Sequence, residues 1–143
     1  EPIVHQIFKI HQYGIMCSPY ISQNAAIEAL TNCDEEVAAM VKEYNIRRTY
    51  LVNEFNRLGL TCFSPEGAFY VFPCIKSTGL SSEEFCERLL FEEKVAVVPG
   101  SAFGDSGEGY IRISYAYSLK HLMEAISRIE KFINSLGGEK NEG

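Results

Sequence analysis

Apolar side chains recur every three or four positions in residues 1–13, 32–58 and 119–136. This spacing places them on one face of a helix, so it predicts three helices. The middle one is the longest and, at about 1.5 Å rise per residue, spans roughly 35 Å. Gly59 and Gly137 follow the second and third stripes, and glycine is the usual residue just beyond a helix. A long spine helix therefore precedes whatever lies in the centre of the chain.

The centre of the chain has a different pattern, in which short apolar or alternating runs are separated by turn residues. Four such runs are candidate strands: Leu60–Phe63, Phe69–Pro73, Val95–Val98 and Tyr110–Ala116. Ser81 and Glu84 have the spacing of a capping box and predict one more helix to about Glu93. Strands with helices between them on a short chain predict an α/β (α+β) fold, with a long spine helix followed by a small sheet and helices packed on one face.

Charge and cysteine content narrow the class of protein. Thirteen basic against nineteen acidic residues give a net charge of −6, which offers no electrostatic footprint for nucleic acid or an anionic membrane surface. No apolar run approaches the roughly 20 residues that cross a bilayer. The five cysteines are scattered, without a metal-ligand or paired spacing, which favours a reducing, cytoplasmic location.

The first residues carry neither an initiator methionine nor a signal-peptide pattern. We therefore expect the sequence to be a piece of a longer polypeptide.

Arg112 is the sharpest candidate for chemistry. Side chains alternate between the two faces of a strand, so Arg112 shares a face with Tyr110 and Ser114 while Ile111 and Ile113 take the other. A guanidinium in that setting can hold a carboxylate through two parallel hydrogen bonds. Alternation alone favours a solvent-facing arginine on a half-exposed strand, because charged residues are mostly exposed.

Two further segments carry weaker signals. The glycine-containing turn at residues 99–104 fits either a backbone concavity for an anion or a plain loop. In residues 67–70, Phe69 fits either the apolar wall of a ligand pocket or a core side chain. The seven lysines offer no third candidate, because none sits in the apolar, glycine-flanked setting that lowers a lysine pKa.

Three stretches in a fixed order resemble one family: residues 67–73 (GAFYVFP), 97–104 (VVPGSAFG) and 110–116 (YIRISYA). They look like the small domain of class I/II, fold-type-I, pyridoxal-phosphate-dependent aminotransferases, of the aspartate-aminotransferase type. Residues 18–30 are similar to the same family where its chain leaves the cofactor domain. The resemblance covers nearly the whole chain, and it implies the small-domain fold.

The resemblance also implies roles for residues. The arginine at the Arg112 position binds the α-carboxylate of the amino-acid substrate, and Phe69 matches a position close to the substrate pocket. Pyridoxal phosphate serves as the electron sink in such enzymes. Its lysine and its other ligands would lie before Glu1, so the resemblance assigns no catalytic and no cofactor-binding residue to this chain. The chain alone should then be inactive.

The resemblance further implies an organisation. Residues 1–30 would be a remnant of the cofactor-binding domain, residues 31–138 the small domain, and residues 139–143 a frayed tail. The partners would be amino-acid and 2-oxo-acid substrates, the missing amino-terminal lobe and a second copy in a homodimer. Apolar residues that normally pack on the missing lobe should be exposed and favour self-association.

The activity of the parent protein stays open in part. An aminotransferase with aspartate-like or broad specificity is the leading hypothesis. A carbon–sulfur lyase or a cyclase-type relative of the same fold is the first alternative. The effector domain of an aminotransferase-like transcription regulator is the second, and a free-standing carboxylate-binding module is the third.

Overall fold

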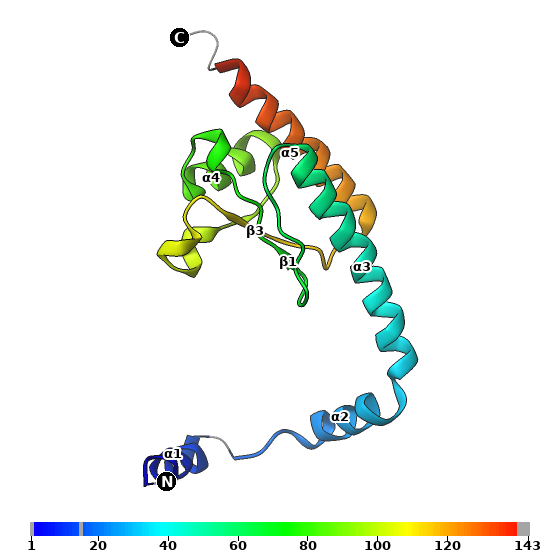
Figure 1. Ribbon diagram of the computed structural model, residues 1–143. Coiled ribbons are helices and arrows are strands. Elements are labelled where there is room, and N and C mark those ends of the chain that lie inside the picture. The colour runs from blue at the N-terminus through cyan, green and yellow to red at the C-terminus, as the bar shows by residue number, and fades with distance from the viewer. Residues whose placement is uncertain (1, 15, 140–143) are drawn as a thin grey trace. The chain divides into compact units, whose positions relative to one another are not determined.

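The computed structural model describes residues 2–14 and 16–139, which form two compact units, Glu1–Met40 and Val41–Gly143 (Figure 1). The first unit contains α1 (Pro2–Gly14) and α2 (Tyr20–Asn32), and neither helix has a buried residue. Helix α3 (Asp34–Arg57) begins in the first unit and continues into the second. No helix in the described part of the chain is long and apolar enough to cross a membrane.

The second unit contains a small sheet and the helices that follow the spine. Its remaining elements are β1 (Tyr70–Val71), η1 (Lys76–Thr78), α4 (Ser82–Glu93), β2 (Val98–Pro99), η2 (Gly100–Phe103), η3 (Asp105–Gly107), β3 (Ile111–Ser114) and α5 (Leu119–Glu139). The sheet is antiparallel with strand order β1-β3-β2, so β3 is the central strand. Tyr70 pairs with Ser114, and Val98 pairs with Arg112.

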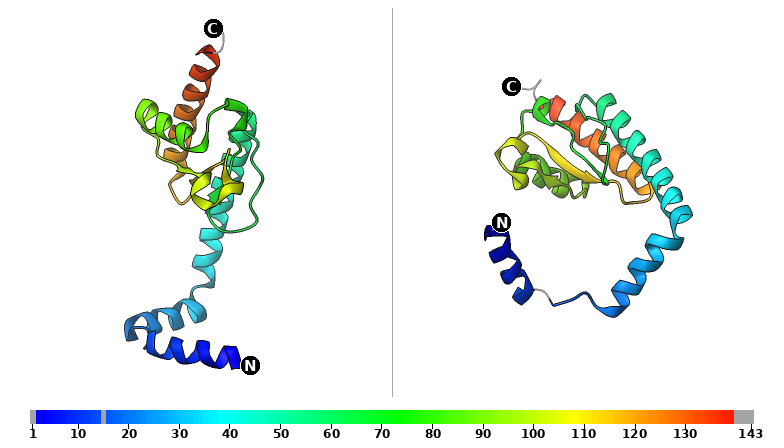
Figure 2. Two further views of the ribbon diagram at one scale, coloured as in Figure 1. Left: turned by 90° about the vertical axis from the view of Figure 1, so that its left-hand side faces the viewer. Right: turned by 60° about the horizontal axis from the view of Figure 1, so that its bottom comes forward.

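One hydrophobic core holds the second unit together. In the second unit α3 and α5 run side by side (Figures 1 and 2), and Arg57 of α3 forms an ion pair with Glu130 of α5 at 2.7 Å. Phe85 of α4 meets Phe132 of α5 edge to face, with ring centroids 5.2 Å apart and both side chains fully buried. The strands add the buried side chains Val71 and Ile111, and Tyr115 follows directly after β3. The inward residues of the sheet thus pack on the helices, and the other face of the sheet lies outside this core.

The predicted fold class is confirmed, and several predicted boundaries are wrong. Residues 60–63 form no strand, because the Asn56 side chain accepts the Cys62 N–H at 3.1 Å and so takes up a donor that a ladder would need. The three observed strands are shorter than predicted. Helix α5 continues through Gly137 to Glu139, since glycine tolerates helical backbone although it weakens it.

The spine helix α3 begins at Asp34, two residues after the start of the predicted range at residue 32. Asn32 is the last residue of α2, and its side-chain amide donates to the Glu28 carboxylate at 2.9 Å. By contrast the Ser81 cap is confirmed, because its hydroxyl accepts the Glu84 N–H at 3.2 Å. The division after residue 30 stays a prediction. So does the tail from residue 139, of which residues 140–143 lie outside the described part of the chain.

Candidate functional site

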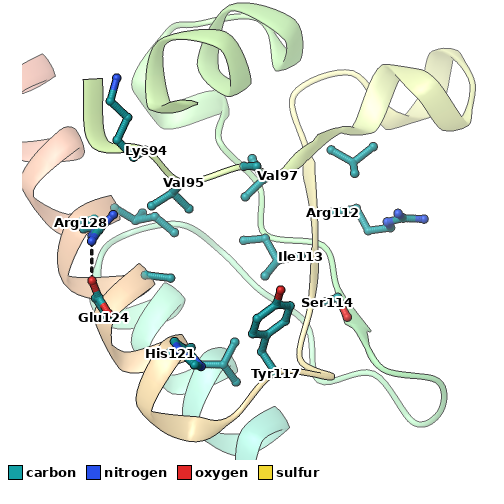
Figure 3. Close-up of a pocket in the computed structure, with 15 residues that line it drawn as sticks. Lys94, Val95, Val97, Arg112, Ile113, Ser114, Tyr117, His121, Glu124 and Arg128 are labelled. Atoms are coloured by element: carbon teal, nitrogen blue, oxygen red, sulfur yellow. Dashed lines mark hydrogen bonds and ion pairs between the residues drawn. The ribbon is translucent and has the colours of Figure 1, made fainter. Parts of the chain in front are cut away.

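Arg112 lies on the central strand, on the face opposite the core. Its neighbours along β3, Ile111 and Ile113, belong to or pack on the hydrophobic core, whereas Arg112 itself is half-buried. In Figure 3 its side chain leaves the strand in the direction opposite to Ile113. The alternation expected from the sequence therefore holds at this strand, and it puts the guanidinium outside the core.

Two aromatic rings contact the Arg112 guanidinium. Its Cζ lies 4.5 Å from the centroid of the Tyr70 ring and 4.7 Å from that of Phe103. Tyr70 comes from β1, where its cross-strand partner Ser114 shares a face with Arg112. Phe103 comes from η2 and also contacts Phe72, at 5.6 Å between centroids. Guanidinium planes stack on aromatic faces, so both contacts are attractive.

No hydrogen bond or ion pair engages Arg112 within residues 2–14 and 16–139. The contrast with Arg57 is clear, because Arg57 holds the Glu130 carboxylate with two nitrogens at 2.7 and 3.1 Å. Arg112 is thus a half-buried cation with aromatic neighbours and no acidic one in the described chain. Its N–H donors are available for an external acceptor, and a carboxylate is the acceptor that the fork matches.

One cavity is lined by Arg112, and a second is lined by the two rings that contact it. One of about 520 Å³ lies between β2, β3 and α5, with Val97, Ile113 and Leu122 on its apolar side and Tyr117 and His121 at its polar side (Figure 3). Arg112 also lines it. The other, of about 430 Å³, is lined mainly by aromatic side chains, and Tyr70 and Phe103 are among them. Arg112 thus lines one cavity and its two rings line the other, and each cavity is large enough for a small metabolite.

Phe69 lies apart from Arg112. Its ring stacks on Tyr44 of α3, with centroids 6.2 Å apart, and its side chain is 40% exposed. The Phe69 ring also contacts the Tyr70 ring, with centroids 4.6 Å apart, and Tyr70 is the one of the two that contacts the arginine. The substrate contact of Phe69 stays a prediction, while Tyr70 and Phe103 are site residues that sequence analysis did not single out.

The loop between β2 and β3 carries Phe103 to the arginine, and it is held at both ends. The Gly100 N–H donates to the Tyr110 carbonyl at 2.8 Å. The Glu108 carboxylate accepts the Ser82 N–H at 2.9 Å, and the buried Ser82 hydroxyl accepts the Gly109 N–H at 2.8 Å. The predicted loop at residues 99–104 thus contains the short helix η2, which places the Phe103 ring beside Arg112.

Comparison with known proteins identifies the family of this chain. The family model for aminotransferase class I and II matches residues 2–129. The chain belongs to this family. A putative aminotransferase of Bacillus subtilis, YugH, is 56% identical over 90% of this chain and 33% of its own length. The aspartate aminotransferase of Pyrococcus abyssi is 48% identical over 92% of this chain and 34% of its own length.

Solved structures of aminotransferases share the fold. An aromatic aminotransferase from Pyrococcus horikoshii superposes with a TM-score of 0.85 at 44% identity, covering 93% of this chain and 36% of that one. An aspartate aminotransferase from Thermotoga maritima gives 0.78 at 40% identity, covering 88% and 32%. The chain therefore spans about a third of the length of the relatives it matches.

Class I and II aminotransferases generally depend on pyridoxal phosphate, which attaches through a buried lysine that is easily deprotonated. The described lysines do not fit that role, because all six are exposed: Lys9, Lys42, Lys76, Lys94, Lys120 and Lys131. Two of them have other partners, since Lys131 pairs with Glu93 at 2.7 Å and Lys94 donates to the Phe91 carbonyl at 2.8 Å. Among the described residues, then, no lysine has the buried setting that a cofactor lysine would need.

Proposed function

We propose that this chain is the carboxyl-terminal part of an aminotransferase and that Arg112 binds the α-carboxylate of its substrates. The observation that carries the proposal is the half-buried guanidinium that contacts Tyr70 and Phe103, with no acidic partner in the described residues. An amino acid and a 2-oxo acid both carry a carboxylate beside the reacting carbon. One arginine would therefore hold the substrates of both half-reactions in the same place.

The rest of the activity is assigned to the portion of the relatives that this chain does not span. Pyridoxal phosphate would be held there and would supply the electron sink for amino-group transfer. The chain's own contribution would be to bind and orient the substrate, with Phe69 as an apolar neighbour of the pocket. We expect a homodimer with the amino-terminal lobe restored, acting in the cytoplasm. Its amino-acid preference would be aspartate-like or broad, since the relatives include both aspartate and aromatic-amino-acid aminotransferases.

The first test replaces Arg112 with lysine in the polypeptide that joins this chain to an amino-terminal lobe like that of its relatives. The substitution turns a two-point contact into a single one, at a cost of about 1.5–3 kcal/mol. We expect kcat/KM for amino acids to fall roughly 10- to 150-fold, with KM raised, measured by steady-state transamination. Arg57→Lys, in the ion pair between α3 and α5, is the matched control.

Unchanged kinetics for Arg112→Lys would remove Arg112 from the site. Release of ammonia and a 2-oxo acid without transfer of the amino group would instead favour the carbon–sulfur lyase alternative for the parent protein.

The second test uses the 143-residue chain by itself. With no buried lysine among the described residues, we expect it neither to transaminate nor to form a stoichiometric, borohydride-trappable adduct with added pyridoxal phosphate. Mass spectrometry after reduction measures this outcome. A single lysine modified in every molecule would contradict the assignment of the cofactor to another part of the protein.

A further inference from the structure

We infer that Tyr70 and Phe103 are positioning residues, which hold the plane of the Arg112 guanidinium ready for a substrate carboxylate. The inference rests on the proposed role of Arg112 and goes beyond it, because it assigns a task to two residues that touch the arginine rather than the substrate. It also identifies what keeps a long, flexible side chain in place without an acidic partner.

The contacts are of the kind that fixes a guanidinium without consuming its donors. Both ring centroids lie within 5 Å of Cζ, at 4.5 Å for Tyr70 and 4.7 Å for Phe103. A ring attracts the face of the guanidinium through its quadrupole, whereas hydrogen bonds are donated from the guanidinium edge. A neighbouring carboxylate would also restrain Arg112, but it would occupy the donors and compete with the substrate. Aromatic contacts avoid that competition.

Restraint has a measurable value for this side chain. A free arginine carries about 2 kcal/mol of rotamer entropy, part of which is lost when it binds a ligand. Rings that already confine Arg112 remove part of that loss from the binding step, which is preorganisation. Substrate binding should therefore weaken when either ring is removed, even though neither ring needs to contact the carboxylate.

The two rings are themselves anchored from different parts of the sheet. Tyr70 is fixed by the pairing of β1 with β3, opposite Ser114. Phe103 packs against Phe72 and belongs to the β2–β3 loop. The end of that loop is hydrogen-bonded to Ser82 of α4 through the Gly109 N–H. Confinement of Arg112 thus depends on the sheet register and on the β2–β3 loop together, and either ring can be removed separately.

The experiment measures transamination by Tyr70→Leu and Phe103→Leu in the complete polypeptide, with Phe91→Leu as the control at an exposed position of α4. Loss of one cation–π contact predicts a rise in KM of about 3- to 10-fold, with a smaller change in kcat. Tyr70→Phe and Phe103→Tyr keep a ring and should restore the KM. A variant that was merely less stable would lower kcat through its active fraction and leave KM unchanged.

A double-mutant cycle asks whether the rings act through the arginine. In an Arg112→Ala background, Tyr70→Leu and Phe103→Leu should no longer change kcat/KM, because there is no guanidinium left to position. Additive effects would overturn the inference. The inference would also be overturned if Tyr70→Leu and Phe103→Leu had the same KM as the control Phe91→Leu while Arg112→Lys had a raised KM. If Arg112→Lys itself has no effect, the proposed function fails, which is a different result.

A spectroscopic measurement on the unaltered 143-residue chain gives an answer even if a variant fails to fold. The Nε–H proton of Arg112 should be shifted upfield by the two rings and should show restricted side-chain motion by nitrogen relaxation. Arg57, held by carboxylates, is the internal reference. An Arg112 signal at the random-coil position with fast, large-amplitude motion would overturn the inference.

Discussion

The two units of the chain differ in how they use the same kind of amphipathic sequence. In Glu1–Met40, α1 places Ile3, Ile7 and Ile10 at helical spacing, yet all three are more than half exposed. In Val41–Gly143, α5 has a similar stripe and buries Ile126 and Ile129 almost completely. Periodicity therefore identifies a helix and its apolar face, whereas burial requires a partner surface. The second unit has its partner within the chain.

The largest effect expected from this difference concerns core truncation. Phe132→Ala removes a fully buried ring that packs on Phe85, so it should lower the free energy of unfolding by about 3–5 kcal/mol. Phe8→Ala, on the exposed face of α1, should change it by less than about 0.5 kcal/mol. Urea denaturation followed by circular dichroism measures both. Equal losses would mean that α1 also contributes to a packed core.

An intermediate effect is expected at Ser82, whose buried hydroxyl connects the β2–β3 loop to α4. Ser82→Ala leaves the Gly109 N–H without its acceptor in a buried position, at a cost of about 1–3 kcal/mol. Ser127→Ala, exposed on α5, is the control and should be near neutral. The same denaturation experiment compares the two. A neutral Ser82→Ala would show that the loop does not depend on this hydrogen bond.

The smallest effect concerns surface charge in the second unit. The hydrogen bonds from Arg57 lower the pKa of Glu130. A carboxyl group with a lowered folded-state pKa stabilises the fold above its unfolded pKa, and this contribution is lost as pH falls through the folded value. We expect Glu130→Gln to reduce the loss of stability between neutral pH and about pH 3, with Glu87→Gln as control. A pH profile identical to that of the unaltered chain would contradict a role for the pair.

The sequence predicts local features of this fold better than nonlocal ones. The Ser81 cap and the outward position of Arg112 depend on neighbours within a few residues, and both are found as expected. The absence of a strand at residues 60–63 depends on the Asn56 side chain, which competes for a backbone donor. An apolar run in the sequence carries no sign of that competition.

The candidate site shows the same limit. Arg112 is identified from strand alternation and family resemblance, but Tyr70 and Phe103 are not. Tyr70 meets the arginine because β1 pairs with β3 in one particular register, and Phe103 does so because a turn of η2 carries it there. Cross-strand register and loop path are set by the assembled sheet. They are therefore invisible until the strands are placed.

The β2–β3 loop is closed at its base by two glycines in contact. A Cβ atom added to Gly100 would lie 2.1 Å from the Gly107 carbonyl oxygen, and one added to Gly107 would lie 2.0 Å from the Gly100 oxygen. Even alanine is too large at either position, so both positions require glycine. A single methyl group at either position should therefore push the two ends of the loop apart.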